Sequence, residues 1–335
     1  MLDATLSRQL RTIIGFAFAG AMFGVGYVVL SFPASWLSLT RGVLTGALIA
    51  GGIVTAEIVA RSSRLAAPLR RLAFVPFVVA KSLLWVGWIT GSLVLIRVVL
   101  PIPGIGALEG LGVDTAYALV VSLALTLIFE LDRLLGPGTL WRLLAGRYHT
   151  PRVEERAFLL LDLAGSTAIA ERIGPAGFLE LLDFVIRELT PAFVASRAEI
   201  YRYIGDAIIV TWPIELAIAE SRILACLGGV VRCMREIGPE CERRFGVRPT
   251  GRAVLHSGSV AIGEVGELKR EITMLGDTLN TTVKLEKICG LLGQRSVISH
   301  DLMSRLTLPA GMAAIPLGEI EIPGRANPIR LYGLG

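Results

Sequence analysis

The sequence lacks the cysteine and histidine patterns that bind transition metals. Only four cysteines and three histidines occur among its 335 residues. No two cysteines are spaced as CxxC, and no histidine stands at metal-ligand spacing from them. The cysteines all lie in the second half of the chain, as Cys226, Cys233, Cys241 and Cys289. We interpret them as buried free thiols in a reducing compartment rather than as metal ligands.

The sequence also lacks a stripe of basic and aromatic side chains. Lys and Arg number 33 against 28 Asp and Glu, which gives a formal net charge of +5. These basic residues are scattered or lie beside apolar segments, whereas nucleic-acid-binding proteins gather them on one face. We therefore attribute the charge to membrane topology and expect no nucleic-acid partner.

Charged residues are scarce before residue 131, where the long apolar runs lie. Hydrophobic residues make up 53% of the chain, more than the roughly half that is usual for soluble domains. Four apolar segments, at 13–32, 42–60, 73–96 and 113–131, each approach the ~20 residues needed to cross a bilayer. We expect residues 1–135 to form a four-helix transmembrane domain in contact with membrane lipid.

Positive charge flanks these segments mainly on one side, and the other two loops carry little of it. The arginines concerned are Arg8, Arg11, Arg61, Arg64, Arg70, Arg71, Arg133, Arg142 and Arg147. Because positive loops stay inside, we expect a multi-pass protein of the plasma membrane with both termini in the cytoplasm. A cleaved signal peptide is the alternative for the first segment, but its apolar run exceeds the roughly 7–15 residues of a signal-peptide core.

Four ionisable residues lie within or beside the apolar segments, namely Glu57, Lys81, Arg97 and Glu130. Three of them are close to segment ends and can extend to the membrane surface. Lys81 is deeper, where an unpaired charge is costly, so we expect it to pair with Glu57 from the preceding segment.

The second half carries two aspartates in strand-and-turn contexts. In RAFLLLDLAGST an apolar strand ends at Asp162, and EIYRYIGDAIIVTW places Asp206 in a turn between two strands. Two carboxylates at adjacent strand ends suit Mg²⁺ or Mn²⁺, which prefer oxygen ligands. The alternative is that Asp162 caps the following helix and Asp206 only serves its turn.

Four segments in order resemble the class III adenylate and guanylate cyclase family. They are FLLLDLAGST, YRYIGDAI, LHSGSVAIGEVG and TMLGDTLNTT. The resemblance covers residues 153–335, with 136–152 as a cytoplasmic linker. It implies an α+β protein whose catalytic domain is ferredoxin-like and acts as a head-to-tail dimer, here a homodimer. A diguanylate cyclase is disfavoured because no Gly-Gly-Asp/Glu-Glu-Phe run is present.

The resemblance also implies roles for individual residues. Asp162, Asp206 and the backbone carbonyl of Leu163 match the ligands of two Mg²⁺ or Mn²⁺ ions per active site. Asn280 matches the ribose-orienting asparagine. Lys284 stands where the family has an arginine that stabilises the transition-state phosphate. Its i+4 spacing from Asn280 keeps both on one helical face, but an ammonium lacks the bidentate contact of guanidinium, so we expect a slower reaction.

Purine choice rests on Arg202 and Thr273, which match the purine-reading pair. Bacterial-type adenylate cyclases commonly have lysine with aspartate or threonine there, so Thr273 fits the pattern and Arg202 departs from it while remaining a cationic donor. A guanine-reading pair would be expected to show glutamate with a small polar residue, so ATP is favoured over GTP. Pro323 falls where a phosphate-binding lysine is frequent. Arg325, or Lys269 with Arg270, could supply that charge, or all three could be ordinary surface cations.

The sequence thus predicts a membrane-bound adenylate cyclase, a phosphorus-oxygen lyase that converts ATP to 3′,5′-cyclic AMP and pyrophosphate. The departures at Arg202, Lys284 and Pro323 leave two alternatives. One is a guanylate cyclase. The other is a catalytically weakened cyclase domain that serves as a membrane sensor or dimerisation module.

Overall fold

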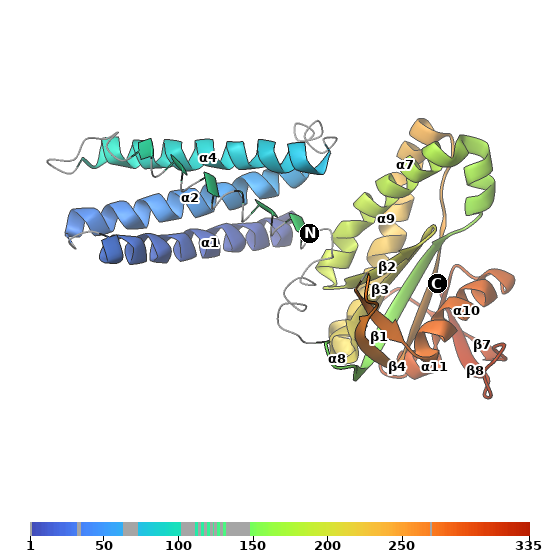
Figure 1. Cartoon of the computed structure of the whole chain (residues 1–335). Coiled ribbons are helices and arrows are strands. Elements are labelled where there is room, and N and C mark those ends of the chain that lie inside the picture. The colour runs from blue at the N-terminus through green and yellow to red at the C-terminus, as the bar shows by residue number, and fades with distance from the viewer. Residues whose placement is uncertain are drawn as a thin grey trace. The chain divides into compact units, whose positions relative to one another are not determined.

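The computed structural model describes most of the chain. The described residues are 2–31, 35–62, 73–101, 111–112, 115–116, 119–120, 123, 126–127, 130–131, 148–268 and 270–335. The chain divides into two compact units, Met1–Leu135 and Gly136–Gly335, which we call unit 1 and unit 2. Unit 1 is helical and unit 2 combines a sheet with helices (Figure 1).

Unit 1 contains the long helices α1 (Leu2–Ser31), α2 (Trp36–Ser62) and α4 (Phe74–Val99). Among the described residues, two stretches are long and apolar enough to cross a membrane, Trp36–Val59 and Phe74–Val99, while the apolar part of α1 is the shorter Ile13–Val29. Of the fourth predicted segment, 113–131, only scattered residues are described, and these are helical. Arg61 lies at the end of α2. The flanking Arg64, Arg70, Arg71, Arg133, Arg142 and Arg147 lie outside the described residues.

Helices α1 and α2 pack through glycines. Gly20 and Gly24 on α1 face Gly46 and Gly42 on α2, so closely that a Cβ at any of the four would overlap backbone atoms of the other helix. Small residues spaced by four let two helix backbones approach in this way. The sequence patterns GAMFG and GVLTG therefore set the separation of these two helices.

Lys81 on α4 lies between two carboxylates. Its Nζ is 2.6 Å from Oε1 of Glu57 on α2 and 2.8 Å from Oε1 of Glu130. The predicted pairing of Lys81 with Glu57 is confirmed. The expectation that Glu130 extends to a surface is wrong, because its side chain is only 10% exposed and bound to Lys81.

Unit 2 contains the remaining helices and strands of the described residues. In chain order they are β1 (Arg152–Leu163), α7 (Ser166–Ala195), β2 (Glu199–Ile204), β3 (Ala207–Pro213), α8 (Ile214–Ile218), η2 (Ala219–Ser221), α9 (Arg222–Phe245), β4 (Gly251–Val265), β5 (Glu271–Leu275), α10 (Asp277–Leu291), β6 (Ser296–Ser299), α11 (His300–Met303), β7 (Ala314–Ile320) and β8 (Ile329–Leu334).

The described strands form one eight-stranded sheet in the order β2-β3-β1-β4-β6-β8-β7, with β5 paired to β4. Within it, β2, β3, β1 and β4 are joined by antiparallel ladders, and α7 and α9 provide the two crossovers. This is the ferredoxin-like arrangement that the sequence predicts. The added strands make the whole a mixed α+β sheet.

The central strand β1 explains how the sheet is covered. Its residues 157–161 are all buried, so it faces helices on both sides. Ala157, Leu159 and Leu161 join the core formed with α7 and α9. Phe158 and Leu160 join a smaller core that includes Leu285 of α10. Figure 1 shows α7 and α9 together on one side of the sheet and α10 on the other.

The turn between β2 and β3 depends on glycine. Gly205 has a φ of 61°, a left-handed conformation that side chains disfavour, and it is followed by Asp206. The register across this hairpin pairs Ile204 with Ala207. Asp206 is thereby held at the tip of the hairpin, as the sequence predicts.

Candidate active site

Asp162 and Asp206 come from neighbouring elements and meet. Asp162 is near the carboxyl end of β1, and Asp206 is in the turn that leads into β3, the strand next to β1. The two carboxyl groups are within hydrogen-bond reach of each other. Leu163 follows Asp162 at the end of β1, paired with Gly251 of β4, and its side chain is buried.

The environment of Asp162 favours its protonated form. Burial, a hydrogen bond with Asp206 and the negative charges of Asp206 and Glu286 together raise the pKa of Asp162 to about 7, although the hydrogen bond from Arg252 acts in the opposite direction. Two carboxyl groups so close together cannot both ionise without a compensating cation. The pair therefore carries excess negative charge when both are deprotonated.

The donor set fits a hard divalent cation. Asp206 Oδ2 is buried without a hydrogen-bond partner, which is unusual because buried polar atoms are normally paired. It lies beside a second carboxylate, and Mg²⁺ and Mn²⁺ are bound by such oxygens. No cluster of three or more His, Cys, Asp or Glu suited to a metal occurs among the described residues. Two carboxylates leave coordination positions for substrate oxygens.

The predicted purine readers lie on two strands that are joined by side chains. Arg202 is on β2 and forms an ion pair with Glu271 of β5, at 2.5 Å from Nη2 to Oε1. Thr273 lies two residues beyond Glu271, on the same face of β5. The hydroxyl of Tyr201 accepts a 3.0 Å hydrogen bond from the backbone of Met274. The structure therefore brings β2 and β5 together, with Arg202 held at the face that carries Thr273.

Helix α10 presents the predicted ribose and phosphate residues. Asn280 is exposed on it, and Lys284 follows one turn later. The Lys284 ammonium donates a 2.6 Å hydrogen bond to the backbone carbonyl of Pro323. Pro323, which replaces an expected lysine, thus contributes an acceptor that holds the cation of Lys284.

The candidate phosphate cations differ in their placement. Arg325 is anchored to α10, at 3.4 Å from both Thr281 Oγ1 and Asp277 Oδ2. Arg270 is largely exposed and lies 4.0 Å from Glu264 Oε2. Lys269 lies outside the described residues. Of these candidates, Arg325 contacts α10, the helix that carries Asn280 and Lys284.

Comparison with known proteins shows one curated relative. No family model matches the chain. Adenylate cyclase 2 of Rhizobium meliloti (strain 1021) is 36% identical over 218 residues, which is 65% of this chain and 60% of that protein. This similarity supports the resemblance of the chain to the class III cyclase family. The chain spans about 60% of the length of this curated relative.

Solved structures of cyclases share the fold of this chain. The structure of a bacterial light-regulated adenylyl cyclase has a TM-score of 0.55 and 15% sequence identity, covering 66% of this chain and 64% of that chain. A second structure of a bacterial light-regulated adenylyl cyclase has a TM-score of 0.53 and 16% identity, covering 64% of each chain.

Two residues of the candidate site were missed by sequence reasoning. Arg252 of β4 donates a 2.9 Å hydrogen bond from Nη2 to Asp162 Oδ2, and the same nitrogen is 3.1 Å from Glu286 Oε1 of α10. Arg252 directly precedes the segment AVLHSGSV, and pairing β4 antiparallel to β1 would have placed it opposite Asp162. Nothing in the spacing of Glu286 marks it as a neighbour of Asp162.

Proposed function

We propose that the chain is a membrane-bound adenylate cyclase that converts ATP to 3′,5′-cyclic AMP and pyrophosphate. The observation that carries the proposal is the contact between Asp162 and Asp206, with Asp206 Oδ2 buried and unpartnered. A pair of crowded carboxylates is costly in a folded protein unless it binds a cation. The resemblance to the class III family supports a nucleotide triphosphate as the substrate.

Asp162, Asp206 and the carbonyl of Leu163 would hold two Mg²⁺ or Mn²⁺ ions. When bound, such ions lower the pKa of the ribose 3′-hydroxyl and neutralise charge on the departing pyrophosphate. Arg252 adds a protein cation at the same place, and its Nε is buried without a partner. That free donor suits an oxygen of the triphosphate.

Positioning falls to α10 and to the two hairpins. Asn280 is exposed and can orient the ribose, while Lys284 directs an ammonium toward the phosphates from the same helical face. Arg202 donates toward the adenine ring, and Thr273 accepts from or donates to its edge. The 3′-oxygen then bonds to the α-phosphorus as the bond to pyrophosphate breaks.

We propose that the active form is a homodimer, with each site completed across the interface. Its support is an exposed apolar surface on the hairpins, where Tyr203 and Ile204 are each 49% exposed and Leu275 is 60% exposed. These side chains belong to β2 and β5, the strands that carry Arg202 and Thr273. A second copy of the chain would cover them and restore the burial that apolar surface favours.

Unit 1 anchors the enzyme as a multi-pass protein of the plasma membrane. Support comes from the two stretches able to cross a bilayer and from the arginines that flank the apolar segments on one side. In the proposed topology four helices contact lipid, and unit 2 faces the cytoplasm, where ATP is present.

The test is a nucleotide cyclase assay on the purified full-length chain with ATP and GTP, in Mg²⁺ and in Mn²⁺. We expect metal-dependent cyclic AMP that disappears in Asp162→Ala and in Asp206→Ala. Glu242→Gln, which breaks an exposed ion pair with Arg248, is the control and keeps wild-type rates. Normal product from both aspartate variants would refute the metal site, and product from GTP alone would identify a guanylate cyclase.

One observation favours the weakened domain as a second candidate. Lys284 stands where the family has the arginine that stabilises the transition-state phosphate. Here its ammonium donates a hydrogen bond to the Pro323 carbonyl. If that contact persists with substrate, the chain binds nucleotide without turnover and acts as a membrane sensor or dimerisation module. Binding of ATP with no product at any Mg²⁺ or Mn²⁺ concentration would establish this candidate over the enzyme.

A further inference from the structure

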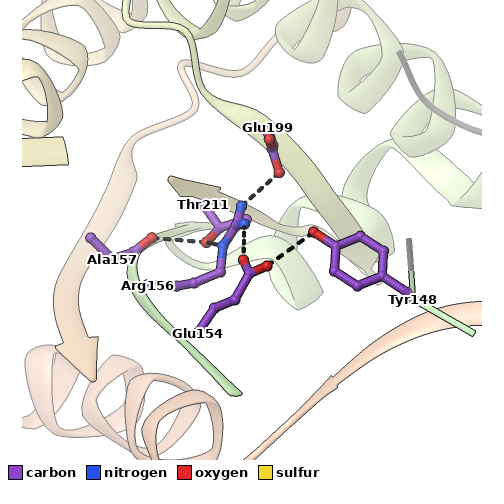
Figure 2. Close-up of polar contacts among 6 residues, drawn as sticks. All are labelled: Tyr148, Glu154, Arg156, Ala157, Glu199 and Thr211. Carbon is purple, nitrogen blue, oxygen red and sulfur yellow. Dashed lines mark hydrogen bonds and ion pairs between the residues drawn. The ribbon is translucent and has the colours of Figure 1, made fainter. Parts of the chain in front are cut away.

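Arg156 is a buried charge in the central strand of unit 2. It is 1% exposed, although it lies on β1 among apolar residues. Its Nη2 is 2.6 Å from Glu199 Oε2, its Nη1 is 3.2 Å from Glu154 Oε2, and its Nε donates to Thr211 Oγ1 at 3.2 Å. Figure 2 shows the guanidinium at the centre of these contacts. Three contacts at fixed positions hold the guanidinium in one orientation.

The contacts of Arg156 join three strands. Glu154 is on β1, Thr211 is on β3 and Glu199 is the first residue of β2. The hydroxyl of Thr211 in turn donates to the Ala157 carbonyl at 2.9 Å. Arg156 therefore reaches from β1 across β3 to the outer strand β2. It ties the end of the β2–β3 hairpin that lies opposite Asp206 to the central strand.

Tyr148 extends this network to the other hairpin. It precedes β1, is 3% exposed, and its hydroxyl donates to Glu154 Oε1 at 3.4 Å. Its backbone carbonyl accepts a 3.1 Å hydrogen bond from the amide of Glu264 on β4. Tyr148 thus contacts the β4–β5 hairpin through Glu264 and, through Glu154 and Arg156, the β2–β3 hairpin.

These are the two hairpins that carry the proposed purine readers. Arg202 is on β2, and Thr273 of β5 pairs with Gly263, the neighbour of Glu264 on β4. We propose that Arg156 is a positioning residue of the nucleotide site, and that through Tyr148 the residues just before β1 set the spacing of the strands that read the purine. The inference rests on the proposed function, since it assigns the purine to these hairpins.

The competing explanation is that the network only maintains the fold. A buried ion pair can specify strand register without touching function. That role predicts a change in stability when the network is cut, with the affinity for nucleotide unchanged. The positioning role predicts weaker nucleotide binding by the folded protein, whatever the change in thermal midpoint, and coupling between distant members of the network.

The experiment cuts the network at its two ends in the full-length chain. Tyr148→Phe keeps the buried ring and removes the hydroxyl. Glu199→Gln removes the negative charge that pairs with Arg156. Affinity is measured with 3′-deoxy-ATP and Mn²⁺, because this nucleotide lacks the attacking hydroxyl and its binding does not require turnover. We expect each change to raise Kd about threefold to tenfold, and the double variant to raise it by less than the product of the two.

Glu155→Gln is the matched control, since Glu155 is on the same strand but pairs with the partly exposed Arg305 at 2.5 Å. Its Kd should equal that of the wild type. Unchanged Kd in both network variants, or effects that multiply independently, would overturn the inference. If Glu199→Gln does not fold, Tyr148→Phe alone decides, and an unchanged Kd overturns it.

The same measurements separate this inference from the proposed function. Nucleotide binding without any cyclic product in the wild type refutes the enzyme, while the affinity comparison still decides the role of Arg156. Normal turnover in the wild type together with unaltered Kd in the variants refutes only the inference. Absence of nucleotide binding in the wild type overturns both.

Discussion

The guanidinium of Arg252 donates a 2.9 Å hydrogen bond to Asp162, so one of the two carboxylates proposed as metal ligands is already held by a protein cation. The same nitrogen lies 3.1 Å from Glu286. Arg252 thus orients the Asp162 carboxylate and offsets part of the negative charge of the pair. The contact ties β4 and α10 to the carboxyl end of β1.

Replacing Arg252 by lysine should slow the reaction while leaving the fold intact. A lysine ammonium is a single point of charge and cannot serve Asp162, Glu286 and a phosphate oxygen together, so we expect kcat/KM to fall about tenfold to a hundredfold. Initial rates with ATP and Mn²⁺ provide the measurement. Arg248→Lys, at an exposed arginine, should be neutral, and wild-type rates in Arg252→Lys would contradict the assigned role.

Stability of the metal-free protein should fall as pH rises. Folded Asp162 keeps its proton up to about 7 because its pKa is raised from 3.8, so between these values the folded state binds more protons than the unfolded state. The free energy of unfolding then decreases with pH through this window. We expect Asp162→Asn, which cannot ionise, to raise Tm relative to wild type at about pH 8 but not at about pH 5.

Thermal unfolding with a chelator present is the measurement for this pH effect. Excess Mn²⁺ should raise the Tm of the wild type at the higher pH, because a bound cation compensates the paired carboxylates. Asp162→Asn should gain less. An equal shift of Tm at both pH values in the variant would show that Asp162 is not the titrating group.

Lys284→Arg should increase the rate. A guanidinium can keep the contact with the Pro323 carbonyl and still offer donors to phosphate oxygens, which the single ammonium cannot do. We expect kcat to rise about tenfold with little change in KM. Lys287→Arg, on the exposed face of the same helix, controls for a general effect of arginine. A lower kcat in Lys284→Arg would show that the ammonium stabilises the transition-state phosphate better than a guanidinium does at this position.

Purine choice should follow Arg202 and Thr273. We expect Arg202→Lys to retain ATP as substrate, because it keeps a cationic donor at that place. Arg202→Glu with Thr273→Ser should shift the ratio of ATP to GTP turnover toward GTP, since a carboxylate accepts from the guanine edge. The added charge also repels Glu271, so total activity should drop. An unaltered ratio in the double variant would place purine reading elsewhere.

Gly46→Leu should disrupt the packing of α1 on α2. A side chain at Gly46 would overlap the backbone of Gly20, whereas Gly26 on α1 has open space around its Cβ position. We expect Gly46→Leu to lower the Tm of the detergent-solubilised chain, and Gly26→Leu to leave it unchanged. Equal Tm values for the two variants would show that the glycine contact does not stabilise unit 1.

Much of the fold followed from local pattern. The apolar run before Asp162 predicted a buried strand, and the dipeptide Gly205-Asp206 predicted the hairpin turn. The helix that follows the strand of Asp162 is α7, which begins at Ser166 and continues across a kink at Gly174.

The candidate site was only partly predictable. Asp162 and Asp206 are marked by strand ends, where short-range sequence signals are strong. Arg252 and Glu286 join them through contacts between β1, β4 and α10, and such contacts depend on register and on helix placement. The buried Arg156 looked like the start of an apolar strand, because its partners Glu199 and Thr211 are distant in the chain.

The sequence by itself determined which segments are helices and strands, where the turn glycine stands, and which aspartates end adjacent strands. Those features depend on backbone conformation and on neighbours within a few residues, so they can be read along the chain. Only the tertiary structure decided that Arg252 holds Asp162, that Pro323 holds Lys284 and that Arg156 joins the outer hairpin to β1. These contacts link residues that only sheet pairing and helix packing bring within hydrogen-bond distance.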